Sequence, residues 1–138
     1  MKIEIRPGVP DSASLWKVFL TTGWNREYNL TEKEYYAAAL KSRFVVCAFD
    51  GDKMIGFGRV ITDGLIHAMI YDLIVLPDYR RCGVGSLLLA KLIELCIEEG
   101  IRDIQLFCAQ GKREFYEKRG FAARKEDSPG MDYNRNNL

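Results

Sequence analysis

Six segments of the chain show the alternating or continuously apolar pattern of β-strands. They are residues 2–6, 44–49, 54–61, 65–76, 101–108 and a last segment that begins at Phe121. Pro7-Gly8 ends the first strand, and Asp50-Gly51-Asp52-Lys53 predicts a hairpin between the second and the third. The run over residues 65–76 predicts a long central strand, which ends at Pro77 because proline cannot donate to a sheet ladder.

Four other segments show the spacing of amphipathic helices. They are residues 12–23, 31–41, 85–99 and 112–119. Asp11 or Ser12 can cap the first helix, and Thr31-Glu32-Lys33-Glu34 is a capping box for the second. Gly100 follows the third helix at the usual position of a C-terminal stop. The predicted order is therefore β-α-α-β-β-β-α-β-α-β.

The chain of 138 residues fits one domain of common size. No linker or internal repeat interrupts the pattern, so we expect a single domain over residues 1–138. Residues 134–138 are mostly polar and are expected to fray.

Composition and charge narrow the class of protein. Apolar residues make up 48% and charged residues 28% of the chain, as in ordinary globular proteins. A formal net charge of +1 without a long single-sign run argues against nucleic-acid binding. No apolar run approaches the ~18 residues of a membrane span, and the N-terminus lacks the apolar core of a signal peptide. The four cysteines form no C-x-x-C pair and His67 is the single histidine, so zinc-ligand spacing is absent. We therefore expect a cytoplasmic protein with reduced thiols that binds neither nucleic acid, membrane nor metal.

A glycine-containing loop joins the central strand to the third helix. Its sequence is Tyr71-Asp-Leu-Ile-Val-Leu-Pro-Asp-Tyr-Arg80-Arg-Cys-Gly-Val-Gly-Ser86. The first N–H groups of a helix lack intrahelical partners, and the helix dipole places partial positive charge there. Gly83 and Gly85 lack a Cβ and let the backbone approach an anion closely, while Arg80 and Arg81 add charge. The loop is therefore predicted to bind a phosphate or pyrophosphate.

Two common phosphate-binding motifs do not fit this loop. A nucleotide P-loop has the form G-x-x-x-x-G-K-[ST], and no Lys-Ser or Lys-Thr follows the glycines here. A dinucleotide fingerprint, G-x-G-x-x-G, has a third glycine where this chain has Leu88. That fingerprint also belongs early in a parallel βαβ unit, whereas this loop lies midway along the chain.

A third signature matches. Arg80-x-x-Gly83-x-Gly85 resembles the [QR]-x-x-G-x-[GA] signature of the GNAT superfamily of N-acetyltransferases, and the segment from Val75 to Arg80 is similar to the strand exit that precedes it. Downstream, Phe115-Tyr-Glu-Lys-Arg-Gly-Phe121 resembles the family's F-Y-x-x-x-G-F motif at the expected distance. The element order is also the family's, so the resemblance covers essentially the whole chain. It implies an α/β fold with a mixed, mainly antiparallel twisted sheet flanked by helices. It also implies transfer of the acetyl group of acetyl-CoA to a primary amine by direct attack.

The resemblance implies an acetyl-CoA site along the central strand and the glycine loop, with acetyl-CoA as cosubstrate and no metal. The backbone of Leu73, Ile74 and Val75 would hydrogen-bond the pantetheine arm. The side chain of Arg80 would reach either the pyrophosphate or only solvent. The amides of a continuous run would hold the pyrophosphate: Arg81, Cys82, Gly83, Val84, Gly85 and Ser86.

Tyr116 matches the family's usual general acid. The amine attacks the thioester and CoA leaves as a thiolate, which a nearby phenol can protonate. An alkylamine has a pKa near ~10.4 and arrives protonated, so a base must accept its proton. Asp72, beside the expected acetyl site, is the first candidate for this base, and His67 or a water chain to solvent are the alternatives. Where family members often have a catalytic glutamate and an asparagine, this chain has Gln105 and Ala109.

Aromatic residues cluster between and within the first two helices. Trp24, Tyr28, Tyr35 and Tyr36 are candidates to line an apolar acceptor pocket, and Glu27 is a candidate to attract a cationic substrate. Tyr35 and Tyr36 fit core positions equally well. The set favours a small-molecule amine as the partner, bound to a monomer or homodimer. Two other functions stay open: acyl-CoA sensing without catalysis, and transfer of a longer acyl group.

Overall fold

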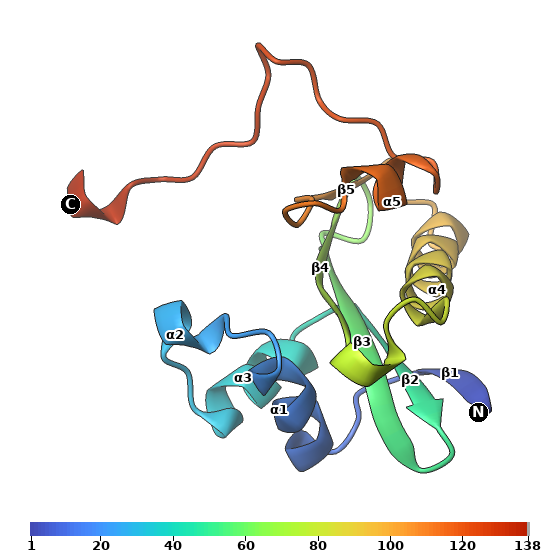
Figure 1. Ribbon diagram of the computed structural model, residues 1–138. Helices are drawn as coiled ribbons and strands as arrows, with labels where there is room; N and C mark the ends of the chain where they lie inside the picture. The colour runs from blue at the N-terminus through green and yellow to red at the C-terminus, as the bar shows by residue number, and fades with distance from the viewer. Residues whose placement is uncertain (138) are drawn as a thin grey trace. The chain divides into compact units, whose positions relative to one another are not determined.

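The computed structural model describes residues 1–137. The chain divides into two compact units, Met1–Leu106 and Phe107–Leu138. The first unit holds every strand, and the second holds α5 (Arg113–Glu117) and a single 3₁₀ turn, η2 (Arg135–Asn137) (Figure 1). Of the end that was expected to fray, Leu138 lies outside the described residues.

The first unit contains a five-stranded sheet in the order β1-β2-β3-β4-β5. The strands are β1 (Ile3–Pro7), β2 (Phe44–Asp50), β3 (Lys53–Thr62), β4 (His67–Val75) and β5 (Asp103–Leu106). The first four pair antiparallel with their neighbours, and β5 pairs parallel with β4. The mixed, mainly antiparallel sheet predicted from the sequence is confirmed.

The helices begin where the sequence supplies caps. They are α1 (Ser12–Leu20), α2 (Asn25–Tyr28), α3 (Glu32–Leu40) and α4 (Val84–Glu98), with a 3₁₀ turn, η1 (Pro77–Tyr79), before α4. The carboxylate of Asp11 accepts a hydrogen bond from the backbone of Ser14 and caps α1. Thr31 and Glu34 form the predicted capping box of α3.

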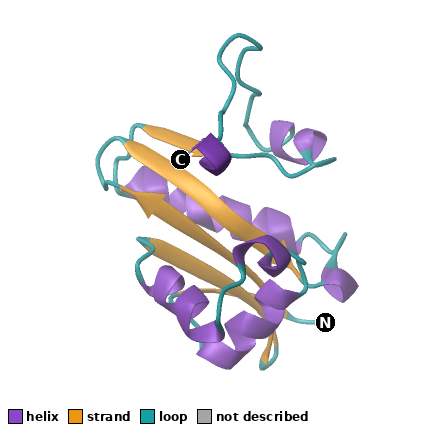
Figure 2. Cartoon of the chain, turned by 90° about the vertical axis from the view of Figure 1, so that its left-hand side faces the viewer, coloured by secondary structure: helices purple, strands orange, loops and turns teal. Residues whose placement is uncertain are grey.

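Helices cover both faces of the sheet in the first unit (Figure 2). On one face, Leu15 and Phe19 of α1 and Tyr35 of α3 pack with Phe57 and Ile74 of the sheet. The opposite face is covered by α4, whose inward residues include Leu88 and Leu92. These two apolar layers bury the middle of β3, where every residue from Met54 to Gly58 is buried.

Two glycines of β3 let α4 lie close to the sheet. A Cβ on Gly58 would lie 2.7 Å from Cδ1 of Leu92, and a Cβ on Gly56 would lie 2.9 Å from Cδ1 of Leu88. Both distances are shorter than carbon contacts allow, so only glycine fits without displacing the leucines. The position of α4, whose N-terminus follows the glycine loop, therefore depends on the Gly-x-Gly spacing in β3.

Several elements differ from the sequence prediction. The strand expected over residues 101–108 spans only Asp103–Leu106. The expected last strand is not formed: among the described residues, those from Phe121 onward contain no strand. The reason is the lack of apolar alternation after Phe121, where Arg124-Lys125-Glu126-Asp127 follows two alanines. The central strand begins at His67 and not at Leu65, because Asp63 Oδ1 accepts hydrogen bonds from the backbone N–H groups of residues 65–67 and holds them in a turn. The structure also adds α2, a single turn that the sequence pattern did not predict.

Candidate active site

The edge of β4 that faces β5 is only partly paired. β5 is in register with the segment from His67 to Ile70, whereas β3 pairs with β4 as far as Val75. Leu73, Ile74 and Val75 therefore lie in the half of β4 that has no β5 partner. Main-chain groups along such an edge can bind an extended ligand as a further strand would bind.

A bulge lies at the point where β4 departs from β5. Between the pairs Phe57–Ile74 and Arg59–Tyr71, two residues of β4 lie opposite the single residue Gly58. One of these two residues is Asp72, whose φ of 54° is in the left-handed region. The bulge changes the course of β4 immediately before the segment that was predicted to bind pantetheine.

The glycine loop ends in a helix N-terminus without a side-chain cap. Gly83 is the N-cap of α4 and has no side chain with which to cap it, and the first turn holds no acidic residue. Arg81 and Gly83 have φ angles of 64° and 81°, so two left-handed residues lie within three positions. Backbone turns of this kind gather N–H groups into a concavity that binds anions. An uncapped N-terminus beside two arginines fits a pyrophosphate.

The loop is fastened at its start to the end of β4. Nε of Arg80 donates a hydrogen bond to the carbonyl of Val75 over 3.4 Å, so this side chain turns back toward the strand. The thiol of Cys82, which is exposed, lies 3.6 Å from the carbonyl of Arg80. The structure thus keeps the predicted loop residues and the end of β4 in one continuous region.

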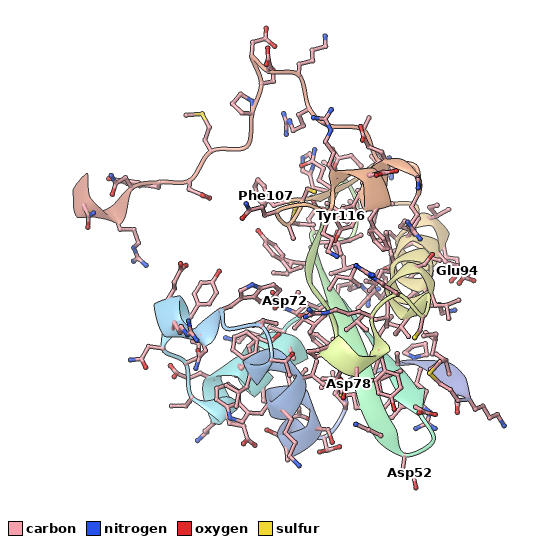
Figure 3. All side chains as sticks on the ribbon, viewed as in Figure 1. Asp52, Asp72, Asp78, Glu94, Phe107 and Tyr116 are labelled. Atoms are coloured by element: carbon pink, nitrogen blue, oxygen red, sulfur yellow. The ribbon has the colours of Figure 1, made fainter. Side chains whose placement is uncertain are left out.

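The side chain of Asp72 (Figure 3) lies on the α1–α3 side of β4 and takes part in a partly buried polar network. Oδ2 of Asp72 accepts hydrogen bonds from Nε of Arg59 over 2.8 Å and from the hydroxyl of Tyr35 over 3.0 Å. The guanidinium of Arg59 also donates to Oγ of Ser42 over 3.2 Å. Burial, followed by the charge of Asp72, raises the pKa of Tyr35 well above its ordinary value, so its phenol stays protonated as a donor.

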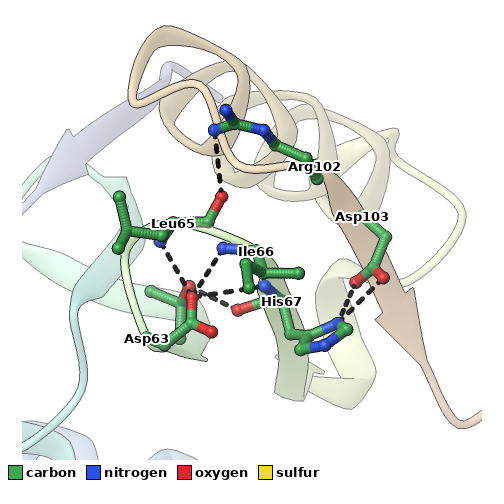
Figure 4. Close-up of polar contacts among 7 residues, drawn as sticks. Asp63, Leu65, Ile66, His67, Arg102 and Asp103 are labelled. Carbon is green, nitrogen blue, oxygen red and sulfur yellow. Dashed lines mark hydrogen bonds and ion pairs between the residues drawn. The ribbon is translucent and has the colours of Figure 1, made fainter.

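His67 lies at the other end of β4 (Figure 4). Its Nδ1 is 2.8 Å from Oδ2 of Asp103 on β5, and both side chains are exposed. The hydrogen bond and the charge of Asp103 raise the pKa of His67 above 6.5. Asp72 lies five positions after His67 along the strand, on the order of 16 Å away at about 3.3 Å per residue. The structure does not bring these two candidate bases together.

The aromatic candidates divide into core and surface residues. Tyr35 is buried and stacks on Phe19 with ring centroids 3.8 Å apart, and the hydroxyl of Tyr36 donates to the carbonyl of Pro10. Trp24, 39% exposed, packs edge-on against Phe19 at 6.5 Å. Contacts therefore run from Trp24 through Phe19 and Tyr35 to Asp72.

Two further residues were predicted to bind the acceptor, and both belong to α2. Tyr28 is 65% exposed, and Glu27 in the same turn is also on the surface. Trp24 directly precedes α2 as its N-cap residue. The three therefore project from one short segment beside the α1–α3 layer.

Tyr116 belongs to the second unit, on α5. Its ring makes edge contacts with Phe115 at 5.1 Å and with Phe121 at 5.9 Å. Burial raises the pKa of Tyr116, and its electrostatic interaction with Cys108 raises it further. The phenol of Tyr116 is therefore protonated at neutral pH.

Sequence reasoning did not identify Arg59 or Ser42. Arg59 could have been recognised as a candidate because it is a charged residue inside the apolar run of β3, next to Gly56-Phe57-Gly58. A mostly buried charge in a strand requires a partner, and the partner of Arg59 is Asp72. Nothing in the sequence distinguishes Ser42 as a partner of Arg59, because a serine just beyond a helix end is common.

The described part of the chain supplies no cluster of three or more side chains suited to hold a metal ion. Within the same residues, none of the helices has the length and apolar character needed to cross a membrane.

Comparison with known proteins identifies the family that has this mixed sheet and this glycine loop. Residues 11–121 match the family model described as "Acetyltransferase (GNAT) family". The chain belongs to the GNAT family of acetyltransferases.

Curated relatives agree with this assignment. The chain is 33% identical over 107 residues to Histone acetyltransferase TAP1 of Glycine max, which covers 69% of this chain and 46% of that protein. It is 34% identical over 79 residues to GCN5-related N-acetyltransferase 3, chloroplastic, of Arabidopsis thaliana, covering 57% of this chain and 33% of the relative. The chain thus spans less than half the length of these curated relatives.

Solved structures match over nearly the whole chain. A GNAT family acetyltransferase from Streptococcus pneumoniae is 27% identical, with a TM-score of 0.81, covering 97% of this chain and 99% of that one. Glucosamine-6-phosphate N-acetyltransferase from Arabidopsis thaliana is 17% identical with a TM-score of 0.72, covering 98% and 99% of the two chains, and shows the shared fold.

Proposed function

We propose that this acetyltransferase moves the acetyl group of acetyl-CoA to the amine of a small molecule by direct attack. The observation that carries the proposal is the continuity of two features in the first unit. The unpaired edge of β4 over Leu73–Val75 leads directly into a loop that ends in the uncapped N-terminus of α4. Acetyl-CoA fits these two features, because its extended pantetheine arm can lie along the strand edge while its pyrophosphate binds at the helix N-terminus.

The amine attacks the thioester carbonyl, a tetrahedral intermediate forms, and CoA leaves as a thiolate. We propose that the phenol of Tyr116, which matches the general acid of the F-Y-x-x-x-G-F motif, protonates this thiolate. The Asp72 carboxylate, close to the start of the open β4 edge, is proposed to orient the incoming amine and accept its proton. A water chain to solvent is the alternative acceptor of that proton.

The acceptor is proposed to bind beside α2, where Trp24, Glu27 and Tyr28 project from one segment. Two aromatic side chains supply apolar contact, and the carboxylate of Glu27 favours a cationic ligand. A small hydrophobic or aromatic amine fits this set. The cytoplasmic location stays a prediction, and the Arabidopsis relative compared here is chloroplastic by name.

The cofactor part of the proposal is tested by thermal shift. Acetyl-CoA is expected to raise the Tm of the protein, whereas ATP and NAD are not expected to do so comparably. Gly83→Val is expected to abolish the acetyl-CoA shift, since a β-branched residue at a φ of 81° forces the loop to rearrange. Gly64→Val is the matched control, because Gly64 has the same φ of 81° and the same open surroundings in a turn far along the chain from the loop.

The transfer step is tested by thiol release from acetyl-CoA with a panel of amines. Thiol release that depends on one class of amine would support the proposed acetyl transfer and identify the class of acceptor. Binding of acetyl-CoA without release by any amine would favour an acyl-CoA sensor, and equal Tm shifts with ATP would contradict the CoA assignment. Faster release from succinyl-CoA or propionyl-CoA would assign a longer acyl group.

A further inference from the structure

The left-handed backbone of Asp72 requires other groups to hold it. A non-glycine residue at a φ of 54° is uncommon and strained, although aspartate tolerates this conformation better than most residues. Such a conformation persists where surrounding contacts determine it. At Asp72 the bulge in β4 and the side-chain contacts of its carboxylate act together.

Those contacts come from two different elements and meet on one oxygen atom. Arg59 reaches Oδ2 of Asp72 from β3, and Tyr35 reaches the same atom from α3. The side chains of Arg59 and Asp72 are 14% and 16% exposed, so water screens this ion pair poorly. Because both donors bind Oδ2, they fix the direction in which the whole carboxylate points.

Arg59 is itself held on two further sides. Its NH1 donates to Ser42 beyond the end of α3, and its guanidinium lies 5.8 Å from the ring centroid of Tyr71. A planar guanidinium can serve these partners at once, whereas the single ammonium of a lysine cannot. The geometry is therefore specific to arginine and is not that of a general surface charge.

We infer that Arg59 is a positioning residue for acetyl transfer and acts through the carboxylate of Asp72. The inference rests on the proposed function, in which that carboxylate meets the incoming amine. Without Arg59, a mostly buried carboxylate on a strained bulge keeps only the hydroxyl of Tyr35, and its direction is no longer fixed. A displacement of about 1 Å at a reacting group can lower a rate by roughly 10²-fold.

The test compares Arg59→Met with Arg59→Lys. We expect kcat to fall at least tenfold in Arg59→Met and by an intermediate factor in Arg59→Lys, with acetyl-CoA affinity within about threefold of wild type in both. Arg43→Met is the matched control, since Arg43 also pairs with a carboxylate, that of Glu99, in the same unit. This control is expected to retain the wild-type kcat.

A double-mutant cycle separates positioning from an independent role. In an Asp72→Asn background, Arg59→Met is expected to lower kcat by a further factor of less than about two, because the carboxylate through which Arg59 acts is already absent. An equal fold loss in both backgrounds would overturn the inference, and so would an unchanged kcat in folded Arg59→Met. If Arg59→Met does not fold, the same cycle is run with Arg59→Lys. Wild-type protein that turns over no amine would overturn the proposed function, and this role with it.

Discussion

The hydroxyl of Tyr79 donates a 2.8 Å hydrogen bond to Oδ2 of Asp50, which ties the turn before the glycine loop to the β2–β3 hairpin. The same carboxylate accepts a hydrogen bond from the backbone N–H of Lys2 through Oδ1. The hydrogen bond to Asp50 raises the pKa of Tyr79, and the hydrogen bond from Tyr79 lowers the pKa of Asp50. The start of the loop is thus anchored to the sheet by a side chain outside the GNAT signature.

Tyr79→Phe is expected to weaken acetyl-CoA binding by roughly 3- to 10-fold, because the loop loses this anchor while the ring is retained. Titration calorimetry with acetyl-CoA measures the change. Tyr36→Phe is the control, since it removes a tyrosine hydrogen bond of the same length, 2.8 Å to Pro10, from another part of the unit. Equal affinities for Tyr79→Phe and wild type would show that the anchor does not position the loop.

Gly58→Ala is expected to destabilise the protein by about 1–3 kcal/mol, the usual cost of adding a methyl group to a packed core. The new Cβ would lie 2.7 Å from Cδ1 of Leu92, so α4 or that side chain must move. Urea unfolding measures the loss. In a Leu92→Ala background, Gly58→Ala is expected to lower the free energy of unfolding by less than it does in wild type. Strict additivity of the two changes would argue against a clash between residues 58 and 92.

The sequence predicted the fold and the loop well because both depend on local patterns. The capping residue Thr31 was identifiable from spacing alone, Asp11 was one of two candidate caps, and Gly83 was recognisable within a motif. The network around Asp72 was not predictable, because Arg59 and Tyr35 come from other elements and meet the carboxylate only in the folded chain. The bulge in β4 was not predictable either, because a register shift depends on how two strands pair in the folded chain. The predicted last strand is wrong, because the residues after Phe121 do not continue an apolar alternation.

The ion pair of His67 and Asp103 predicts a pH-dependent contribution to stability. The pKa of His67 is raised from 6.5 by its hydrogen bond to Asp103. A raised folded-state pKa gives stability that is fully present below 6.5 and is lost as the pH rises through the folded value. The Tm difference between wild type and Asp103→Asn is therefore expected to be larger at pH 5.5 than at pH 8.5, and small at both because the pair is exposed. A difference that grows with pH would contradict the assignment.

The same residue tests the identity of the base. His67 lies at the far end of β4 from Asp72, so His67→Gln is expected to leave kcat within about twofold of wild type. A tenfold loss of kcat with an unchanged Tm would instead place the imidazole at the reaction.

Trp24→Ala is expected to raise the KM for the amine roughly 5- to 10-fold and to leave acetyl-CoA affinity nearly unchanged. The indole is partly exposed and rests edge-on against Phe19, so its outer face is available to a ligand. Steady-state kinetics with the amine varied measures the effect. Leu40→Ala, which removes another exposed apolar side chain from the α1–α3 layer, serves as the control. A large loss of acetyl-CoA binding would place Trp24 outside the acceptor site.

Tyr116→Phe tests the residue on which the proposed chemistry most depends. The change keeps the ring, and with it the edge contacts to Phe115 and Phe121, so the Tm is expected to change little. The hydroxyl is proposed to protonate the departing thiolate, an interaction made chiefly in the transition state. We therefore expect kcat to fall by roughly 10²-fold or more, the usual scale of general-acid catalysis, with the KM for acetyl-CoA nearly constant.

Tyr133→Phe is the control for this change, because Tyr133 is an exposed tyrosine of the same unit and is expected to retain full activity. A loss confined to the KM of Tyr116→Phe would make the hydroxyl a binding group. The decisive measurement is single-turnover acetyl transfer, in which product release does not limit the rate. A rate there equal to that of wild type would remove Tyr116 from the acid step, because a leaving thiolate that needs no proton from this phenol must obtain it from water.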